Sequence, residues 1–140
     1  MQKYMKKTLD YYETNAEDYK REWSNTFLAN YDFTIPDIFL KFLPNGASIL
    51  DLGCGTGRDS KYFLEQGYKV TAIDGSKEFC KMASEILNMP VRELNFLDMN
   101  YNHEFDGVFA CASLLHLDNQ DLINVLESIH KSLKNNGVLY

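Results

Sequence analysis

The stretch Ile49-Leu-Asp-Leu-Gly-Cys-Gly-Thr-Gly57 constrains the fold more than any other part of this sequence. A short apolar run changes within two residues into three alternating glycines, Gly53, Gly55 and Gly57. Glycine has no Cβ, so it permits a positive φ and lets a ligand approach the backbone closely. The run also contains a carboxyl group, on Asp51. We therefore predict a strand that ends in a tight, ligand-binding turn, with an acid beside it.

Strand-like and helix-like segments alternate from residue 47 onward. Apolar runs predict strands at 47–52, 69–74, 90–94 and 105–112, and a fifth strand that begins at 138. Helical patterns lie between them, at 57–67, at 77–88 after a Ser76 cap, and in a long helix that Asp118 caps and the Asn-Asn-Gly at 135–137 ends. Repeated strand–helix units form a parallel sheet with helices on both faces. The predicted fold is α/β, Rossmann-like and doubly wound, with a mainly parallel sheet of about five strands.

Residues 1–45 are predicted to form a helical cap on an α/β core of residues 46–140, within a single domain. Apolar and aromatic residues recur there at spacings of three and four, as on one face of a helix: Leu9, Tyr12, Ala16, Tyr19 and Trp23. Asn15 could break this helix into two pieces, and a second short helix is expected from Pro36 to Leu43. The hydroxyls of Tyr12 and Tyr19 need a partner when buried, so these residues either pack or contact a ligand.

A second acid, Asp74, ends the second predicted strand. In open parallel sheets, ligands bind beyond the carboxyl ends of the strands. A carboxylate at that position can accept both hydroxyls of a ribose diol. The amides at the start of the helix after the glycine turn are free to donate hydrogen bonds. Together these features predict a nucleoside cofactor.

The spacing of the glycines distinguishes two kinds of nucleoside cofactor. A dinucleotide fingerprint is Gly-x-Gly-x-x-Gly. Here the third glycine, Gly57, comes one position too early, and Arg58 occupies the position where the fingerprint has its third glycine. A cofactor with an amino acid end is the alternative to a pyrophosphate. Its carboxylate could meet the loop amides or Arg58, and its ammonium group could meet Asp51. An NAD-linked oxidoreductase is therefore disfavoured, although it stays open as a rival.

Four motifs together resemble the class I S-adenosylmethionine (SAM) dependent methyltransferases, which have a Rossmann-like fold. The glycine stretch at 49–57 is similar to the first motif of that family. The others are similar to its second, third and fourth motifs: Val-Thr-Ala-Ile-Asp-Gly-Ser at 70–76, Leu-Asn-Phe-Leu-Asp-Met at 94–99, and the segment 105–117, which ends in Ser-Leu-Leu-His-Leu. The tyrosine-bearing segment 11–19 resembles the family's N-terminal cap over the cofactor. The resemblance covers nearly the whole chain.

The resemblance implies SAM as the cofactor and S-adenosylhomocysteine (SAH) as its product. The acidic balance and the short cap favour a small-molecule methyl acceptor over nucleic acid, and the scattered cysteines and histidines predict no metal site. Asp74 would bind the ribose and Asp98 the adenine amino group. The residues expected to bind the cofactor are Asp51, Gly53, Cys54, Gly55, Gly57, Arg58, Asp74, Gly75, Ser76, Leu97, Asp98, Met99, Cys111, Ala112, Tyr12 and Tyr19. Cys54 could equally serve in packing. His116 is the candidate catalytic residue, as a general base or a substrate contact, or else it packs among leucines.

Composition bears on partners and compartment. The formal net charge of −6 and the pI of about 5.0 disfavour nucleic acid as a partner, because an acidic surface repels a phosphate backbone. Three scattered cysteines suit a reducing compartment. No apolar run approaches the length of about 20 residues that crosses a bilayer. We therefore expect a cytoplasmic protein with no membrane partner.

The sequence stops soon after its fifth predicted strand begins, whereas the family's sheet has seven strands and ends in an antiparallel hairpin. We therefore expect a chain truncated after the start of strand five. An open apolar edge invites pairing with another chain, so we expect a homodimer through the exposed fifth strand. A SAM-binding domain without catalysis is the alternative that this short length leaves open.

Overall fold

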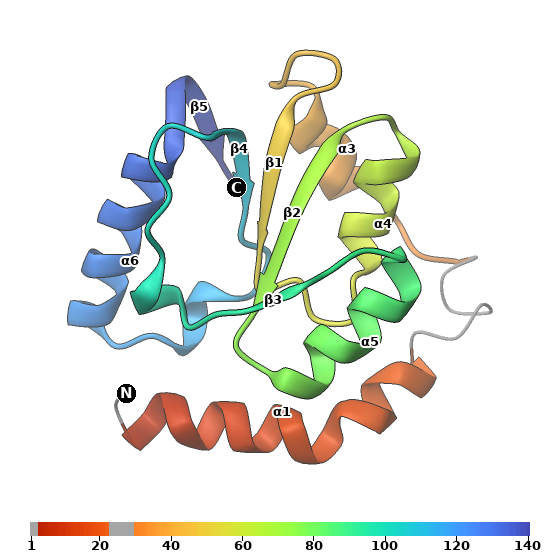
Figure 1. Ribbon diagram of the computed structural model, residues 1–140, viewed down its shortest axis with the longest axis vertical. Helices are drawn as coiled ribbons and strands as arrows, with labels where there is room; N and C mark the ends of the chain where they lie inside the picture. The colour runs from red at the N-terminus through yellow and green to blue at the C-terminus, as the bar shows by residue number, and fades with distance from the viewer. Residues whose placement is uncertain (1–2, 23–29) are drawn as a thin grey trace.

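A parallel sheet of five strands forms the centre of the computed structural model, which describes residues 3–22 and 30–140 (Figure 1). The strands lie in the order β3-β2-β1-β4-β5. Their bounds are Ser48–Leu52 for β1, Lys69–Asp74 for β2, Arg92–Glu93 for β3, Phe105–Phe109 for β4 and Leu133–Leu139 for β5. All neighbouring strands pair in parallel. The predicted α/β, Rossmann-like fold is confirmed.

The strand order reverses beside β1. From β1 the chain adds β2 and then β3 toward one edge, and it returns to place β4 on the other side of β1. Asp51 pairs with Phe109 on β4 and with Ala72 on β2, so the carboxyl ends of these three parallel strands lie at the same edge of the sheet. That edge, at the reversal point, is where open parallel sheets bind ligands.

Helices cover both faces of the sheet (Figure 1). On one face lie α3 (Thr34–Leu40), α4 (Arg58–Glu65) and α5 (Lys77–Leu87), and on the other lies α6 (Asn119–Ser132). Ile49 and Leu50 are both fully buried, but Ile49 packs in the cluster around Phe63 and Leu50 in the cluster around Val125. Successive strand residues point to opposite faces, so β1 is buried on both.

The first helix, α1 (Lys3–Glu22), lies across one end of the sheet (Figure 1). It packs on α5 and on the 3-10 turn η2 (Leu114–His116), which follows β4. Ala16 is buried against Phe79 and Met82 of α5. The helix α1 therefore covers the carboxyl ends of the strands, while the division into a cap of residues 1–45 and a core of residues 46–140 stays a prediction.

Two features of the cap differ from the sequence prediction. Asn15 does not break α1, because its Nδ2 donates to the carbonyl of Tyr11, 2.7 Å away, within the continuing helix. The second short helix spans Thr34–Leu40 rather than 36–43. Trp23, which was expected on the apolar face of the first helix, lies outside the described residues.

The C-terminal elements also differ from the prediction. The Asn-Asn-Gly at 135–137 was expected to end the long helix, but α6 ends at Ser132 and β5 begins at once. Phe105 pairs with Leu133 and Gly107 with Val138, so hydrogen bonding to β4 extends the strand through the irregular Asn-Asn-Gly segment. At the other end, β4 stops at Phe109, which places residues 111 and 112 in a turn instead of a strand.

Candidate functional site

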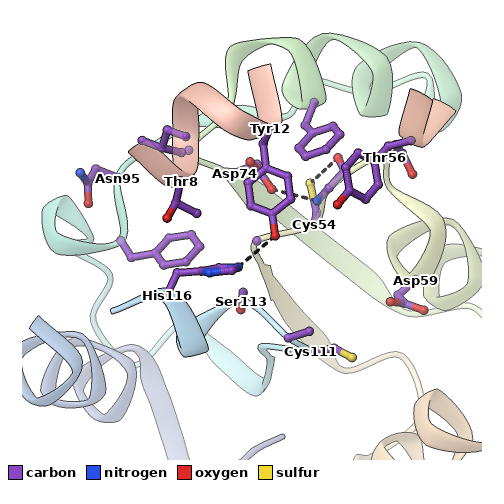
Figure 2. A pocket seen from close by; sticks show the side chains of 18 of the residues that line it. Thr8, Tyr12, Cys54, Thr56, Asp59, Asp74, Asn95, Cys111, Ser113 and His116 are labelled. Atoms are coloured by element: carbon purple, nitrogen blue, oxygen red, sulfur yellow. Dashed lines mark hydrogen bonds between the residues drawn. The ribbon is translucent and has the colours of Figure 1, made fainter. Parts of the chain in front are cut away.

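A cavity of about 380 Å³ lies between α1 and the carboxyl ends of β1, β2 and β4 (Figure 2). Many of the predicted site residues line it: Tyr12, Tyr19, Gly53, Cys54, Gly55, Arg58, Asp74, Gly75, Cys111, Ala112 and His116. The other lining residues were not predicted from the sequence: Thr8, Leu9, Thr56, Asp59, Phe79, Asn95, Phe96, Ser113 and Leu117. Five of these residues stand inside the quoted motifs, so the motifs themselves could have indicated them: Thr56, Asn95, Phe96, Ser113 and Leu117.

The glycine turn takes the conformation that the sequence required. Gly53, Gly55 and Gly57 have φ values of +80°, +56° and +90°. A Cβ on Gly53 would lie 2.5 Å from the Cβ of Ser113, and one on Gly57 would lie 3.2 Å from the Cβ of Ala83. A Cβ on Gly55 would meet no atom of the described residues within 4 Å. Two of the glycines are thus needed for packing, whereas Gly55 leaves its backbone open toward the cavity.

Asp74 holds this turn in place. Its Oδ2 accepts a hydrogen bond from the amide of Gly55 at 2.9 Å, and its Oδ1 accepts one from the amide of Ser76 at 2.8 Å. Burial raises the pKa of the Asp74 carboxyl, while the two amide bonds oppose that rise. A carboxylate offers about four lone-pair positions. Asp74 therefore keeps accepting capacity on the cavity side after it has fixed the loop.

Asp51 lies behind the turn and does not line the cavity. Its Oδ2 accepts a hydrogen bond of 2.6 Å from the hydroxyl of Ser60 on α4, and the residue is only 3% exposed. Burial raises the pKa of the Asp51 carboxyl to about 7, with the charges of Asp59 and Asp74 adding to the rise and the Ser60 hydrogen bond opposing it. Its expected bond to a cofactor ammonium stays a prediction.

The raised pKa predicts a pH-dependent contribution of Asp51 to stability. In the unfolded chain the carboxyl ionises near its ordinary pKa of about 3.9, whereas in the folded chain it ionises near 7. The folded state therefore binds more protons between these values, and the contribution of Asp51 falls as pH rises through that window. We expect Asp51→Asn to gain stability relative to the native chain as the pH rises from about 4 to about 7, by up to roughly 1.4 kcal/mol per pH unit, and to gain little more above that range. Urea denaturation of both proteins across this range measures the difference, and parallel pH profiles would contradict it.

Arg58 lines the cavity, and its positive charge is already paired with the carboxylate of Asp59. Its Nε and a terminal nitrogen donate to the carboxylate oxygens of Asp59 at 3.0 and 2.7 Å. The guanidinium carbon lies 3.8 Å from the centre of the Tyr31 ring. An incoming carboxylate at Arg58 would therefore meet a guanidinium that shares its donors with Asp59.

Tyr12 and His116 meet across the cavity (Figure 2). The Tyr12 hydroxyl lies 2.9 Å from Nε2 of His116, and it donates this hydrogen bond when the imidazole carries its proton on Nδ1. Burial is the main cause that raises the pKa of Tyr12, so the hydroxyl keeps its proton. Nearby, Ser113 Oγ is buried and has no hydrogen-bond partner in the described part of the chain. Both Ser113 and His116 are thus polar groups that a ligand could engage.

Several predicted residues make other contacts and do not line the cavity: Asp51, Gly57, Ser76, Leu97, Asp98 and Met99. Ser76 caps α5 as predicted, because its Oγ accepts from the amide of Phe79 at 3.2 Å. Met99 is buried in the main core beside Leu50. Leu97 and Asp98 belong to the 3-10 turn η1 (Phe96–Asp98), which contributes only Phe96 to the lining. Their roles toward a cofactor stay predictions.

Among residues 3–22 and 30–140, no group of three or more His, Cys, Asp or Glu side chains is placed to hold a metal ion. Within the same ranges, no helix has both the length and the apolar character that a membrane span requires.

Comparison with known protein families gives a match over most of the core. The family model described as "Methyltransferase domain" matches residues 49–137. Among curated proteins, a putative methyltransferase of Bacillus subtilis, YqeM, is 32% identical over an alignment of 108 positions, which covers 69% of this chain and 42% of that protein. A glycine/sarcosine N-methyltransferase of Parasynechococcus marenigrum is 29% identical over an alignment of 144 positions, which covers 89% of this chain and 51% of that protein. The chain spans about half the length of these curated relatives.

Solved structures show the same fold. A TehB-like SAM-dependent methyltransferase from Corynebacterium glutamicum superposes with a TM-score of 0.78 at 24% identity, over 90% of this chain and 72% of the other. The Burkholderia thailandensis 1,6-didemethyltoxoflavin-N1-methyltransferase, solved with its substrate and SAH, gives a TM-score of 0.74 at 25% identity, over 94% of this chain and 58% of the other.

Proposed function

Because this chain belongs to the family of methyltransferase domains, we propose that it binds SAM in the cavity beneath α1 and transfers the methyl group to a small-molecule acceptor. One observation carries the proposal. The positive-φ turn leaves Gly55 open to the cavity, and a buried carboxylate from the next strand, Asp74, holds the amide of that residue. The named substrates of relatives, glycine or sarcosine and a toxoflavin precursor, support an acceptor of small size.

The residues that line the cavity fit the parts of SAM. Asp74 would accept the ribose hydroxyls with its remaining lone pairs. The turn at 53–55 and Arg58 would receive the amino acid end, close to Asp51. The buried Ser113 Oγ, which has no hydrogen-bond partner among the residues that the structure describes, offers a further polar contact. The aromatic ring of Phe96 and the amide of Asn95 lie where the third motif is expected to meet the adenine.

Bound SAM supplies an electrophilic methyl group on a sulfonium, and its neutral thioether product needs no acid to leave. The protein's task is then to position the acceptor and to exclude water. Orientation alone can contribute up to roughly 7–11 kcal/mol in favourable cases. Where the acceptor loses a proton, His116 Nε2 is the base at hand, and it becomes available once the Tyr12 hydroxyl moves away.

Isothermal titration calorimetry with SAM, SAH and NAD tests this function. We expect both adenosyl ligands to bind and NAD not to bind. Binding of NAD alone would overturn the proposal in favour of an oxidoreductase. Binding of SAM without methyl transfer to any member of a panel of phenols, amines and thiols, both by this chain and by a version extended with C-terminal strands, would indicate a binding domain without catalysis.

The assembly and the compartment are also proposed here. Among the described residues, β5 pairs only with β4, and Leu139 and Tyr140 at its end are 43% and 46% exposed. Unpaired strand edges favour pairing with another chain. We expect a homodimer through β5 that light scattering detects at twice the chain mass, and a monodisperse monomer would contradict it.

The three free cysteines are compatible with the reducing conditions of the cytoplasm.

A further inference from the structure

Glu13 makes the contact by which α1 reaches the ligand-binding edge of the sheet. Its Oε1 accepts a hydrogen bond from the hydroxyl of Ser76 at 2.7 Å. The same oxygen lies 3.4 Å from the amide of Glu78, which donates to it. These donors belong to the cap and first turn of α5, where backbone amides are free and the helix dipole favours a negative charge. The cap helix is thus fastened to the core by a carboxylate.

Ser76 links Glu13 to the glycine turn. The Ser76 side chain is fully buried, and its Oγ also accepts from the amide of Phe79, so the hydroxyl proton is directed to Glu13. The Ser76 amide donates to Asp74 Oδ1 at 2.8 Å, and Asp74 Oδ2 accepts from the Gly55 amide at 2.9 Å. One chain of hydrogen bonds therefore runs from α1 through Ser76 and Asp74 to the open glycine.

These hydrogen bonds bring the carboxylates of Glu13 and Asp74 close together. Burial is the main cause that raises the pKa of Asp74, and the charge of Glu13 contributes to the same rise. Two like charges at this distance repel each other unless donors hold both of them. The donors that do so are the Ser76 hydroxyl and the Glu78 amide for Glu13, and the Ser76 and Gly55 amides for Asp74. Ser76 therefore serves both acids, which couples their positions.

We propose that Glu13 is a positioning residue for the cofactor: by holding Ser76, it keeps Asp74 directed at Gly55 and at the ribose hydroxyls, and it couples the seating of α1 to cofactor binding. This inference rests on the proposed function, because Asp74 matters to affinity only if the cavity takes an adenosyl ligand. Glu13 does not line the cavity itself and acts through Ser76.

The test is the affinity for SAH of the whole chain, measured by calorimetry. We expect Glu13→Ala to weaken binding about 5- to 20-fold, the loss of one to two hydrogen bonds. Glu13→Gln keeps an oxygen that accepts from Ser76, and it should recover most of the affinity. Glu17→Ala is the matched control, since it removes the same group from an exposed position on the same helix, and it should leave the affinity unchanged.

A double-mutant cycle with Asp74→Asn separates positioning from general support of the cap. If Glu13 acts through Asp74, Glu13→Ala costs clearly less affinity in the Asp74→Asn background than in the native one. If Glu13→Ala only weakened the packing of α1, the affinity for SAH would fall by the same factor in both backgrounds. Equal factors, or a loss no larger than that of Glu17→Ala, would overturn the inference.

A second readout needs no ligand. Hydrogen exchange of the Gly55 amide, followed by NMR, should speed up at least threefold in Glu13→Ala and stay unchanged in Glu17→Ala, because Asp74 then holds that amide less firmly. If the native chain bound neither SAM nor SAH, the proposed function and this inference would both fail. If the native chain bound SAH and neither the affinity nor the exchange responded to Glu13, only the inference would fail.

Discussion

Replacing Asp74 with alanine is expected to weaken SAH binding about 100-fold or more. The change removes the acceptor proposed for the ribose, and it also releases the amides of Gly55 and Ser76, which the carboxylate now holds at 2.9 and 2.8 Å. Hydrogen bonds to a charged group are each worth about 1.5–3 kcal/mol, and about 2.7 kcal/mol corresponds to 100-fold in affinity. Calorimetric titration with SAH measures the loss directly.

Two companion variants define what the loss means. Asp74→Asn keeps an oxygen for one amide but loses the charge, so its affinity should fall between those of the native chain and Asp74→Ala. Asp10→Ala removes an exposed acid from α1 and should have no effect. A folded Asp74→Ala variant that binds SAH as tightly as the native chain would show that the ribose lies elsewhere.

Replacing Gly53 with alanine is expected to lower the free energy of unfolding by about 2–4 kcal/mol. The residue has φ of +80°, and a Cβ there would lie 2.5 Å from the Cβ of Ser113 and 3.1 Å from the ring of Phe96. The backbone conformation accounts for only about 1–2 kcal/mol of this cost. The remainder comes from the collision with the Cβ of Ser113, which is bonded directly to the backbone and cannot move away unless the backbone shifts. Urea denaturation followed by circular dichroism gives the value.

The matched control for Gly53 is Gly46, which has φ of +71° and open space where a Cβ would stand. Gly46→Ala should show the conformational cost alone. In the double variant Gly53→Ala with Ser113→Gly, the collision with the Ser113 Cβ is removed and part of the stability should return. Equal losses for Gly53→Ala and Gly46→Ala would mean that the turn relaxes freely around the added methyl group.

The parts of the molecule that follow local patterns were predictable from the sequence. The strands β1 and β2, the positive-φ glycines and the caps at Ser76 and Asp118 depend on residues close together in the chain, and the structure confirms each of them. The ends of α6 and β5 were not predictable in this way. Pairing of β5 with β4 decides where α6 stops, and the residues around Ser132 do not indicate this end by themselves.

The parts of the site that join distant segments were beyond local patterns. The bond between Tyr12 and His116 links residues 104 positions apart, and that between Glu13 and Ser76 links residues 63 apart. Sequence spacing indicated that the two tyrosines face inward, but not which groups they meet. For Asp51, the position beside the turn suggested a ligand contact. The fold also gives its carboxylate a hydrogen bond from Ser60, which the sequence did not indicate.

The reversal of strand order beside β1 has a consequence for the growing chain. The cavity takes residues from α1, from the turn after β1 and from the segment after β4, so it cannot exist until residues up to 117 have been made and have folded back beside β1. A ligand that bridges these segments binds only the completed arrangement. At a free concentration of 100 times its dissociation constant it would add about 2.7 kcal/mol to the stability of that arrangement. The cellular supply of the ligand would then help to set how much of this protein survives quality control.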